Sequence, residues 1–408
     1  CPPLHHVVWF QCCAVIFYMV QDILVLGASG DIGTQALDLL RYSFDYRVLG
    51  LSLHSRIERI EPFLFYFDQL KYIAIEDENK AEEFKKRHPL ARYEIIKGPL
   101  ASLKMLQREQ GATVLNAISG NDGLLPTLTA LKQNQDLLLA NKESLVIGYE
   151  LIKPLLKGYR GSLFPIDSEH VALSKVIKEV KGKRIDSYFI TASGGSLRDY
   201  RREEFASLTP KDVLKHPTWN MSKKITIDCA TLVNKAYEVI EAKNLFQLEQ
   251  VDAYLCRSSL IHAGVFIHEG NERKRITEFS PNDMKVSIAY ALSKGTLSLH
   301  QKDEEEREKE KENLLLPIDH SFYPLFSLTL RFYEKYNGAG MIYYNAVDSV
   351  VIEQFLQEKV SFLDIEQALS YTYSHLPSLL PLSEETLPQL LDESKRFASS
   401  LIEKKPWR

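Results

Sequence analysis

The chain lacks several features that would place it in a simple class. Its 50 Lys and Arg against 54 Asp and Glu leave a net charge of −4, which excludes a general attraction to nucleic acid or anionic membranes. Cysteine is scarce: five in 408 residues, three of them before residue 19, and Cys229 and Cys256 lack metal-ligand spacing. We therefore expect a reducing compartment, the cytoplasm, with neither nucleic acid nor membrane as partner.

The N-terminal stretch also lacks what a targeting segment needs. Residues 1–18 are apolar but contain no Lys or Arg, whereas signal peptides begin with basic residues and transit peptides are rich in Arg. The stretch is short for a membrane span and includes His5, His6 and Gln11. We interpret residues 1–18 as an extension of unknown status and Met19 as the natural functional start.

What the chain does have is a regular alternation of short apolar runs and helical patterns. The runs are residues 22–27, 47–52, 71–75, 93–96, 113–118 and 136–140. This alternation predicts an α/β domain with a doubly wound parallel sheet over residues 19–165.

The remainder divides by composition. Residues 166–298 mix predicted strands (184–191 and 253–267) with a predicted helix (228–243), which indicates an α+β domain. The charge run at 302–312 is typical of a solvated helix or linker, placed at 299–317. The pattern over residues 318–408 predicts a helical domain.

A glycine-rich turn follows the first predicted strand. Gly27 and Gly30 in GASGDIG permit a tight turn before a helix, whose N–H groups and dipole favour a pyrophosphate. The alternative is a tight turn without a ligand. At the end of the second strand, His54, Ser55 and Arg56 stand where an acid would select NAD, so NADPH is favoured. The competing interpretation of Arg56 is a solvent-exposed helix residue.

Two carboxylates, Asp167 and Glu169, lie two residues apart at a strand-to-helix junction. With Glu238 they would form an oxygen cage for Mg²⁺ or Mn²⁺. Asp and Glu are also ordinary helix-start residues, so capping is the alternative. We expect no cationic side chain to lie clearly among the three carboxylates.

Further candidates follow other predicted strands. Lys142 in ANKES is placed to hold a polar substrate beside the metal, and the TASGGS segment to form a phosphate nest. A loop with Trp219 and Met221 is suited to act as a lid. Their alternatives are a surface lysine and a loop pinned to the core by its tryptophan.

In this order the motifs resemble those of the 1-deoxy-D-xylulose 5-phosphate reductoisomerase family of the non-mevalonate isoprenoid pathway. The resemblance extends from about Gln21 to the C-terminus and weakens after Ser298. It rests on the segments GASGDIG, LLANKESLV, FPIDSEH, TASGGSLRD, HPTWNMSKKITIDCATLVNKAYEVIEA and SLIHAGV. It implies a Rossmann-like NADPH-binding domain, an α+β catalytic domain with a lid loop, a C-terminal helical domain and a homodimer.

The resemblance also implies roles for individual residues. The implied metal ligands are Asp167, Glu169 and Glu238, for Mg²⁺, Mn²⁺ or Co²⁺. The implied catalytic residues are Lys142, Glu169, His216 and Glu238. The implied substrate-binding residues are Ser168, Glu169, Ser193, His216, Trp219, Cys229, Asn234, Lys235 and Glu238. The implied cofactor-binding residues are Gly27, Ser29, Gly30, Asp31, Ile32, His54, Ser55, Arg56, Asn141, Glu143 and Met221.

The chain departs from the family pattern at several positions. Cys229 replaces a phosphate-binding Ser, and a thiol is a weaker hydrogen-bond donor than a hydroxyl. Asp31 replaces a Ser of the pyrophosphate loop, where its charge would repel a phosphate. Ser196-Leu197 replaces Pro-Phe, and the segment from Leu53 to Arg56 lacks Gly-Lys-Asn.

The implied reaction rearranges a ketose phosphate to an aldehyde, which takes hydride from NADPH to give 2-C-methyl-D-erythritol 4-phosphate. Retro-aldol cleavage and a direct 1,2-shift both remain open. Two other functions compete: an NADP-dependent dehydrogenase without the isomerase step, and a non-enzymatic NADPH-binding or scaffold protein. Metal dependence discriminates the first, and substrate-dependent NADPH oxidation the second.

Overall fold

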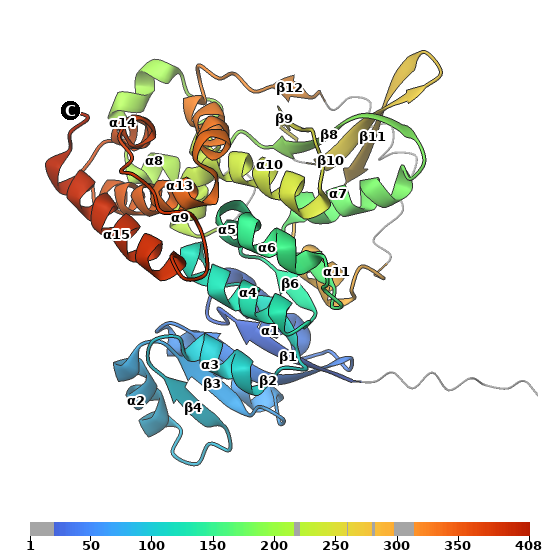
Figure 1. The fold of residues 1–408 in the computed structure, drawn as a ribbon, viewed down its shortest axis with the longest axis vertical. Helices are drawn as coiled ribbons and strands as arrows, with labels where there is room; N and C mark the ends of the chain where they lie inside the picture. Colours follow the sequence, from blue (N-terminus) through green and yellow to red (C-terminus); the bar gives the residue numbers. More distant parts are fainter. Residues whose placement is uncertain (1–19, 216–220, 259, 280–281, 298–313) are drawn as a thin grey trace, which may run out of the picture.

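The computed structural model describes residues 20–215, 221–258, 260–279, 282–297 and 314–408. The predictions for residues 1–18, for His216 and Trp219, and for the charge run at 302–312 therefore lie outside the described residues. Two sheets and a group of C-terminal helices make up the described part of the chain (Figure 1). None of its helices is long and apolar enough to cross a membrane.

The first sheet has seven parallel strands in the order β4-β3-β2-β1-β5-β6-β7. Its strands are β1 (Gln21–Leu26), β2 (Tyr46–Leu53), β3 (Tyr72–Ile75), β4 (Glu94–Lys97), β5 (Thr113–Asn116), β6 (Leu137–Leu139) and β7 (Leu163–Pro165). The first six confirm the predicted apolar runs to within a residue or two. The strand order reverses between β1 and β5, and ligands bind at such a point in doubly wound sheets. The glycine turn lies at the end of β1.

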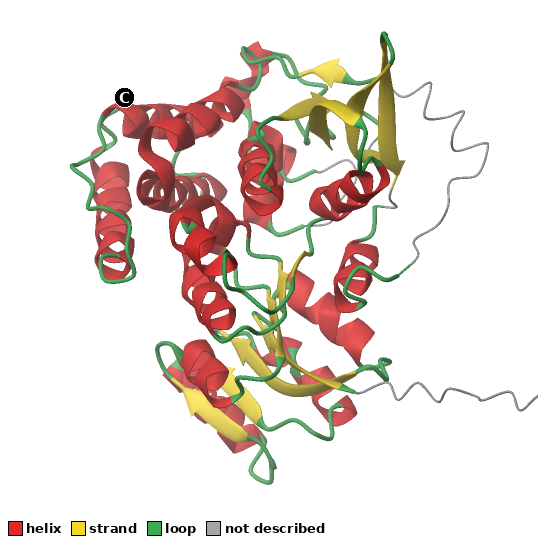
Figure 2. Cartoon of the chain, turned by 45° about the vertical axis from the view of Figure 1, so that its right-hand side comes forward, coloured by secondary structure: helices red, strands yellow, loops and turns green. Residues whose placement is uncertain are grey.

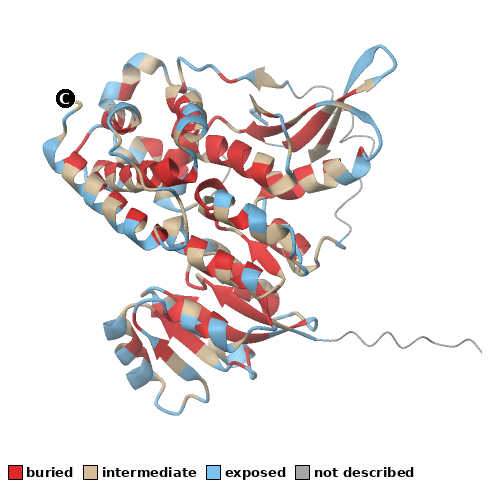
Figure 3. Cartoon of the chain, in the orientation of Figure 1, coloured by how far each residue is buried: buried red, intermediate tan, exposed pale blue. Residues whose placement is uncertain are grey.

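Helices cover both faces of this sheet (Figure 2). They are α1 (Asp31–Leu40), α2 (Glu78–Arg87), α3 (Ala101–Arg108), α4 (Leu124–Lys132), α5 (Lys142–Ile147) and α6 (Tyr149–Leu156). The inner strands are almost wholly buried, the edge strand β4 is partly exposed, and the helices expose one face (Figure 3). Gly33 is required for close packing, because a Cβ there would lie 2.3 Å from the Gly27 carbonyl oxygen.

The second sheet is mixed and has the order β11-β10-β8-β9-β12. Its strands are β8 (Arg184–Ala192), β9 (Val251–Leu255), β10 (Ile261–Glu269), β11 (Glu272–Phe279) and β12 (Leu316–Pro317). The predicted strand region 253–267 is thus two strands rather than one run: β9 pairs with β8 in parallel, and β10 lies antiparallel between β8 and β11. The residues of β12 fall within the predicted linker 299–317, yet they pair with β9.

Helix α7 (Ser168–Glu179) and helix α10 (Val233–Phe246) pack on the second sheet. The prediction of one helix over Asp228–Lys243 is wrong. Two helices, α9 (Lys223–Thr231) and α10, are separated by Leu232, whose φ is 60°. A left-handed residue cannot continue a right-handed helix. The break turns Cys229 and Asn234 towards one cleft.

The C-terminal region is helical, with α13 (Pro324–Leu356), α14 (Phe362–Ser374) and α15 (Leu387–Lys404). Its apolar side chains share one core with the helices on one face of the first sheet. Helix α11 (Met284–Leu292), although it follows the second sheet in sequence, packs on α1 of the first. Lys285 Nζ donates to Asp38 Oδ2 at 2.6 Å, and Tyr46 donates to the Leu292 carbonyl at 2.8 Å.

Candidate active site

A cleft lies between the first sheet and the second, below the N-terminus of α7. Its lining includes twelve of the candidate residues: Asp31, Ile32, Lys142, Asp167, Ser168, Glu169, Ser193, Met221, Cys229, Asn234, Lys235 and Glu238. Most come from the end of a strand or the first turns of a helix, whereas Cys229 lies in the last turn of α9 and Met221 just before that helix. The fold therefore brings together polar and charged side chains from segments that lie more than 200 residues apart in the sequence.

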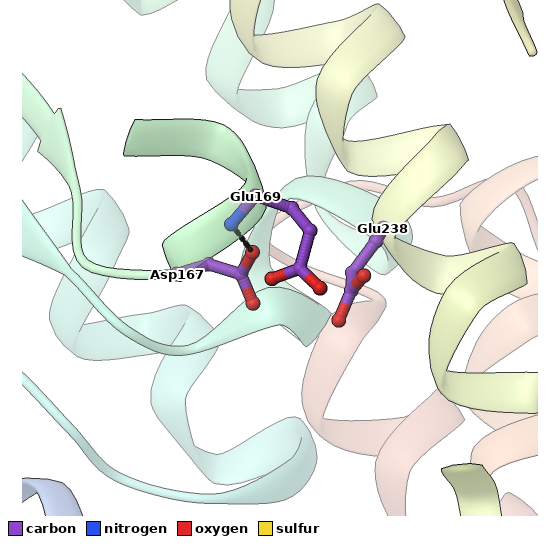
Figure 4. A group of neighbouring side chains, drawn as sticks. All are labelled: Asp167, Glu169 and Glu238. Carbon is purple, nitrogen blue, oxygen red and sulfur yellow. Dashed lines mark hydrogen bonds between the residues drawn. The ribbon is translucent and has the colours of Figure 1, made fainter. Parts of the chain in front are cut away.

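The three predicted metal ligands converge (Figure 4). One carboxylate oxygen of each of Asp167, Glu169 and Glu238 lies within 4.8 Å of the others. Asp167 is also the N-cap of α7, because its Oδ1 accepts the backbone N–H groups of Glu169 (3.1 Å) and His170 (3.4 Å). Capping and convergence are therefore compatible, since the second oxygen, Oδ2, remains on the cleft side.

The expectation that no cation lies among these carboxylates is wrong. Lys142 Nζ lies 2.8 Å from Asp167 Oδ2 and 2.5 Å from Glu238 Oε1. Lys235 Nζ lies 2.8 Å from Glu169 Oε1 and also contacts Glu238 Oε2. The physical reason is charge balance, because one buried and two half-buried carboxylates this close would repel each other strongly without positive charge between them.

The pKa values follow from this balance. Burial opposes ionisation of Asp167, but the Lys142 ammonium and His170 hold the pKa of Asp167 well below its usual range. Burial likewise opposes ionisation of Glu169, but the Lys235 ammonium outweighs burial and lowers the pKa of Glu169. Burial and the nearby Asp167 charge raise the pKa of Glu238. Glu238 is therefore the carboxylate that most requires a cation to remain ionised.

A second group of residues surrounds the far end of the cleft. Asn234 Nδ2 donates to Glu238 Oε1 at 2.6 Å and Asn234 Oδ1 accepts from Lys142 at 2.9 Å, so Asn234 faces Glu238 one turn away. Gly195 has a φ of 68°, and a Cβ there would lie 2.5 Å from the Cys229 carbonyl oxygen. The backbone after β8 thus approaches α9 closely. Ser193 and Cys229 both line this end of the cleft.

The candidate cofactor residues separate into two groups. Asp31 and Ile32 line the cleft at the start of α1. His54, Ser55 and Arg56 follow β2 outside the cleft lining, with His54 and Arg56 exposed. The negative charge of Asp31, beside the glycine turn, is offset by Arg59, whose Nη1 lies 2.9 Å from Asp31 Oδ1.

Asn141 and Glu143 also lie outside the cleft lining. Asn141 is buried, caps α5 by accepting the Ser144 N–H at 2.9 Å, and donates to the Ile118 and Gly120 carbonyls. Its amide also donates to Glu143 at 2.9 Å. These contacts shape the turn that precedes Lys142. Gly27, Ser29 and Gly30 supply the turn after β1 and do not line the cleft.

Sequence reasoning missed several residues of the site. His262 on β10, Gln35 on α1 and Met284 on α11 line the cleft. Behind the carboxylates lie His170 and Glu241, both buried. A polar residue inside an apolar strand was the available signal for His262, but such residues are more often satisfied core residues. Met284 carried no signal, since α11 reaches the cleft only through the tertiary fold.

Comparison with known proteins agrees with this architecture. Residues 23–148 match the 1-deoxy-D-xylulose 5-phosphate reductoisomerase family, residues 163–246 its C-terminal domain, and residues 279–397 the DXP reductoisomerase C-terminal domain. The reductoisomerase of Thermotoga neapolitana is 34% identical over 94% of this chain and 97% of its own length. That of Bacillus subtilis is 33% identical over 94% and 100%.

Solved structures give the same result. The Zymomonas mobilis reductoisomerase in complex with NADPH superposes with a TM-score of 0.79 at 27% identity, covering 94% of this chain and all of that one. A DOX-P reductoisomerase in complex with NADPH, fosmidomycin and magnesium superposes with a TM-score of 0.82 at 27% identity, covering 94% and 98%. With three matched segments, relatives of this similarity and a cleft with these residues, the chain belongs to the 1-deoxy-D-xylulose 5-phosphate reductoisomerase family.

Proposed function

We propose that this protein catalyses the NADPH- and divalent-metal-dependent conversion of 1-deoxy-D-xylulose 5-phosphate to 2-C-methyl-D-erythritol 4-phosphate, and that the cleft between the two sheets is where it does so. The observation that carries the proposal is the convergence of Asp167, Glu169 and Glu238 within 4.8 Å. A dehydrogenase that only transfers hydride would account for the first sheet but leaves this carboxylate set unexplained. Hard oxygen ligands in this number suit Mg²⁺, and also Mn²⁺.

The residues present fit a divalent ion. The ammonium groups of Lys142 and Lys235 lie against these carboxylates and offset their negative charge. A bound ion would take over that role, and it would supply Lewis acidity towards adjacent oxygens of the ketose phosphate. The two lysines are then available for the substrate: Lys142 beside its backbone oxygens and Lys235 towards its phosphate.

The phosphate end of the cleft is assigned to Ser193, Asn234 and Lys235, with Cys229 beside them. These residues can anchor a phosphate remote from the reacting carbons and so orient the substrate before reaction. Met221 lines the cleft next to the segment that contains His216 and Trp219. We assign that segment the role of a lid, which would exclude water from the aldehyde that takes the hydride.

NADPH is assigned to the first sheet. Its pyrophosphate would lie at the N-terminus of α1, at the point where the strand order reverses, and its nicotinamide near Ile32 and Met221. The division into a cofactor domain (19–165), a catalytic domain (166–298), a linker (299–317) and a helical domain (318–408) remains our proposal. A homodimer, a cytoplasmic location and use of Mn²⁺ are likewise proposed.

The test is NADPH oxidation that depends on 1-deoxy-D-xylulose 5-phosphate, followed by absorbance. We expect turnover to disappear after exhaustive chelation and to return with Mg²⁺ or Mn²⁺. Glu238→Gln should reduce turnover by about two orders of magnitude or more, because it removes a charge from the ion's cage, yet leave the Kd for NADPH unchanged.

The matched control is Glu249→Gln, the same substitution at an exposed position just beyond α10. It should retain wild-type turnover. Undiminished turnover in the chelated enzyme would refute the metal-dependent mechanism, and the absence of any substrate-dependent oxidation would favour a non-enzymatic role.

A further inference from the structure

One buried carboxylate near the site has no role in the function proposed above. Glu241 lies on α10, one turn beyond Glu238, and is 1% exposed. A buried charge is costly unless it is compensated, and this one lies near the carboxylates of Asp167 and Glu238. Its Oε2 atom is buried and receives no hydrogen bond. Within the described part of the chain, its ion-pair partner is His170.

His170 is held from three directions. Its Nε2 lies 3.0 Å from the carbonyl oxygen of Glu238, which can only accept, so Nε2 carries a proton. Its Nδ1 lies 3.1 Å from Asp167 Oδ1 and 3.5 Å from Glu241 Oε2. The ring is fully buried, with no exposed surface. The imidazole is thus clamped between α10 and the N-cap of α7.

The clamp fixes one face of Asp167. Oδ1 receives the N–H groups of Glu169 and His170 together with the contact from the His170 ring. Oδ2 points to the opposite side, where Lys142 Nζ lies at 2.8 Å. The side chain can turn only if the His170 ring moves, and Glu241 opposes that movement.

We propose that Glu241 is a positioning residue: through the His170 ring it holds Asp167 with Oδ2 directed towards Glu169 and Glu238, the set that would bind a divalent ion. The inference rests on the proposed function of the Asp167, Glu169 and Glu238 set. Groups of this kind behind a metal ligand typically contribute 10–100-fold to metal affinity. Glu241 itself contacts neither the ion nor the substrate.

A purely structural role for Glu241 predicts a different result. In that case the His170–Glu241 contact ties α7 to α10 and nothing more, so its loss would lower the melting temperature without altering the affinity for the ion. The two roles separate when stability and metal binding are measured on the same variant. Asn244 provides the comparison, because it lies on the next turn of α10, is buried, and donates to the Leu145 carbonyl and the Tyr333 hydroxyl.

The experiment measures the Kd for Mn²⁺ by the electron paramagnetic resonance of the free ion, without substrate or cofactor. Glu241→Gln preserves shape and removes the charge, and it should weaken Mn²⁺ binding about tenfold or more. Asn244→Ala should lower the melting temperature while leaving the Kd within about twofold of wild type. The Kd for NADPH, from its fluorescence, should be unchanged in both.

A double-mutant cycle completes the test. Because Glu241 is argued to act through the ring, Glu241→Gln combined with His170→Gln should weaken Mn²⁺ binding no more than the stronger single variant. If Glu241→Gln does not fold, Glu241→Asp decides the matter in the same assay. A change in the Mn²⁺ Kd of less than about threefold in the folded variant overturns the inference. Failure of the wild-type protein itself to bind Mn²⁺ would instead refute the proposed metal centre.

Discussion

Cys229 lines the cleft at the end assigned to the phosphate, six positions before Lys235. Burial and the negative charge of Glu238 raise the pKa of its thiol to about 12, so it remains protonated at neutral pH. A neutral thiol donates only a weak hydrogen bond. Phosphate binding then depends mainly on Ser193, Asn234 and Lys235.

This environment makes Cys229 testable. Cys229→Ser should keep the fold and keep or lower the substrate KM, because a hydroxyl donates better than a thiol. Cys229→Val, of similar volume but without a donor, should raise that KM by about three- to tenfold and leave the Kd for NADPH unchanged. If valine is tolerated with no change in the substrate KM, Cys229 is simply a small buried residue.

Two arginines follow β2, and their proposed roles can be distinguished. Arg56 is exposed, whereas Arg59 neutralises Asp31 at the first position of α1. Arg56→Ala should weaken NADPH binding and leave NADH binding nearly unchanged, because only NADPH carries a 2′-phosphate. Arg59→Ala should weaken both cofactors, because it leaves the Asp31 carboxylate facing the shared pyrophosphate.

Fluorescence titrations with NADPH and NADH on both variants make the comparison. Equal losses for the two cofactors in Arg56→Ala would assign Arg56 a structural role.

Residue identities predicted the carboxylate set but not its surroundings. Asp167 and Glu169 share a turn, so their convergence follows from local geometry, whereas that of Glu238 requires the tertiary fold. Lys142 was expected beside the metal, but the ion pairs of Lys142 and Lys235 with the carboxylates were not expected. A long flexible side chain takes its direction from charges supplied by distant segments. Glu241 and His170 were missed for the same reason: their partnership exists only once α7 and α10 pack together.

At the scale of elements, the strands of the first sheet were predictable because fully buried strands are short continuous apolar runs bounded by turn residues. The join of α9 and α10 was not. Residues 228–243 have no glycine or proline at the break, and Leu232 adopts its left-handed conformation although a leucine is unfavourable there. Tertiary packing against α13 and the second sheet overrides the local preference.

Helix α9 is tied to α13 by a buried charge cluster. Lys224 Nζ lies 2.7 Å from Asp228 Oδ2 and 2.6 Å from Asp348 Oδ2. Burial, and then the Asp348 charge, raise the pKa of Asp228 from 3.8 to about 8. Because the folded chain binds this proton more tightly than the unfolded chain, its contribution to stability is complete below about pH 4 and is lost as the pH rises through about 8.

Asp228→Asn should therefore flatten the fall in the free energy of unfolding between about pH 4 and about pH 8. Urea unfolding at several pH values, with wild type as reference, provides the measurement. The exposed Asp122→Asn is the matched control and should reproduce the wild-type slope. A parallel slope in Asp228→Asn would mean that Asp348 or another buried carboxyl carries the proton.

On the scale of the whole molecule, helices and sheets far apart in sequence share cores. The C-terminal helices bury their apolar side chains against the helices on one face of the first sheet. Local pattern predicts each helix of such a group but not its partner, because the pattern reports which face is buried and not what covers it. The predicted boundaries at 165 and 298 follow changes in sequence pattern, but elements on either side of each boundary pack into the same cores.

The packing of α11 on the first sheet determines which fragments of the chain can fold on their own. Ile288 and Ala291 are part of the same core as the strands and α1, and Lys285 is paired with Asp38. A contiguous fragment of residues 20–165 would therefore contain all seven strands of the first sheet but lack α11, which covers part of its core. Expressed alone, it should bind the apolar dye ANS and aggregate, whereas the same fragment with residues 282–297 attached through a flexible linker should remain monodisperse. The part of the protein that we propose to bind NADPH is therefore formed by two separate stretches of the sequence, and transplanting it into another protein would require both.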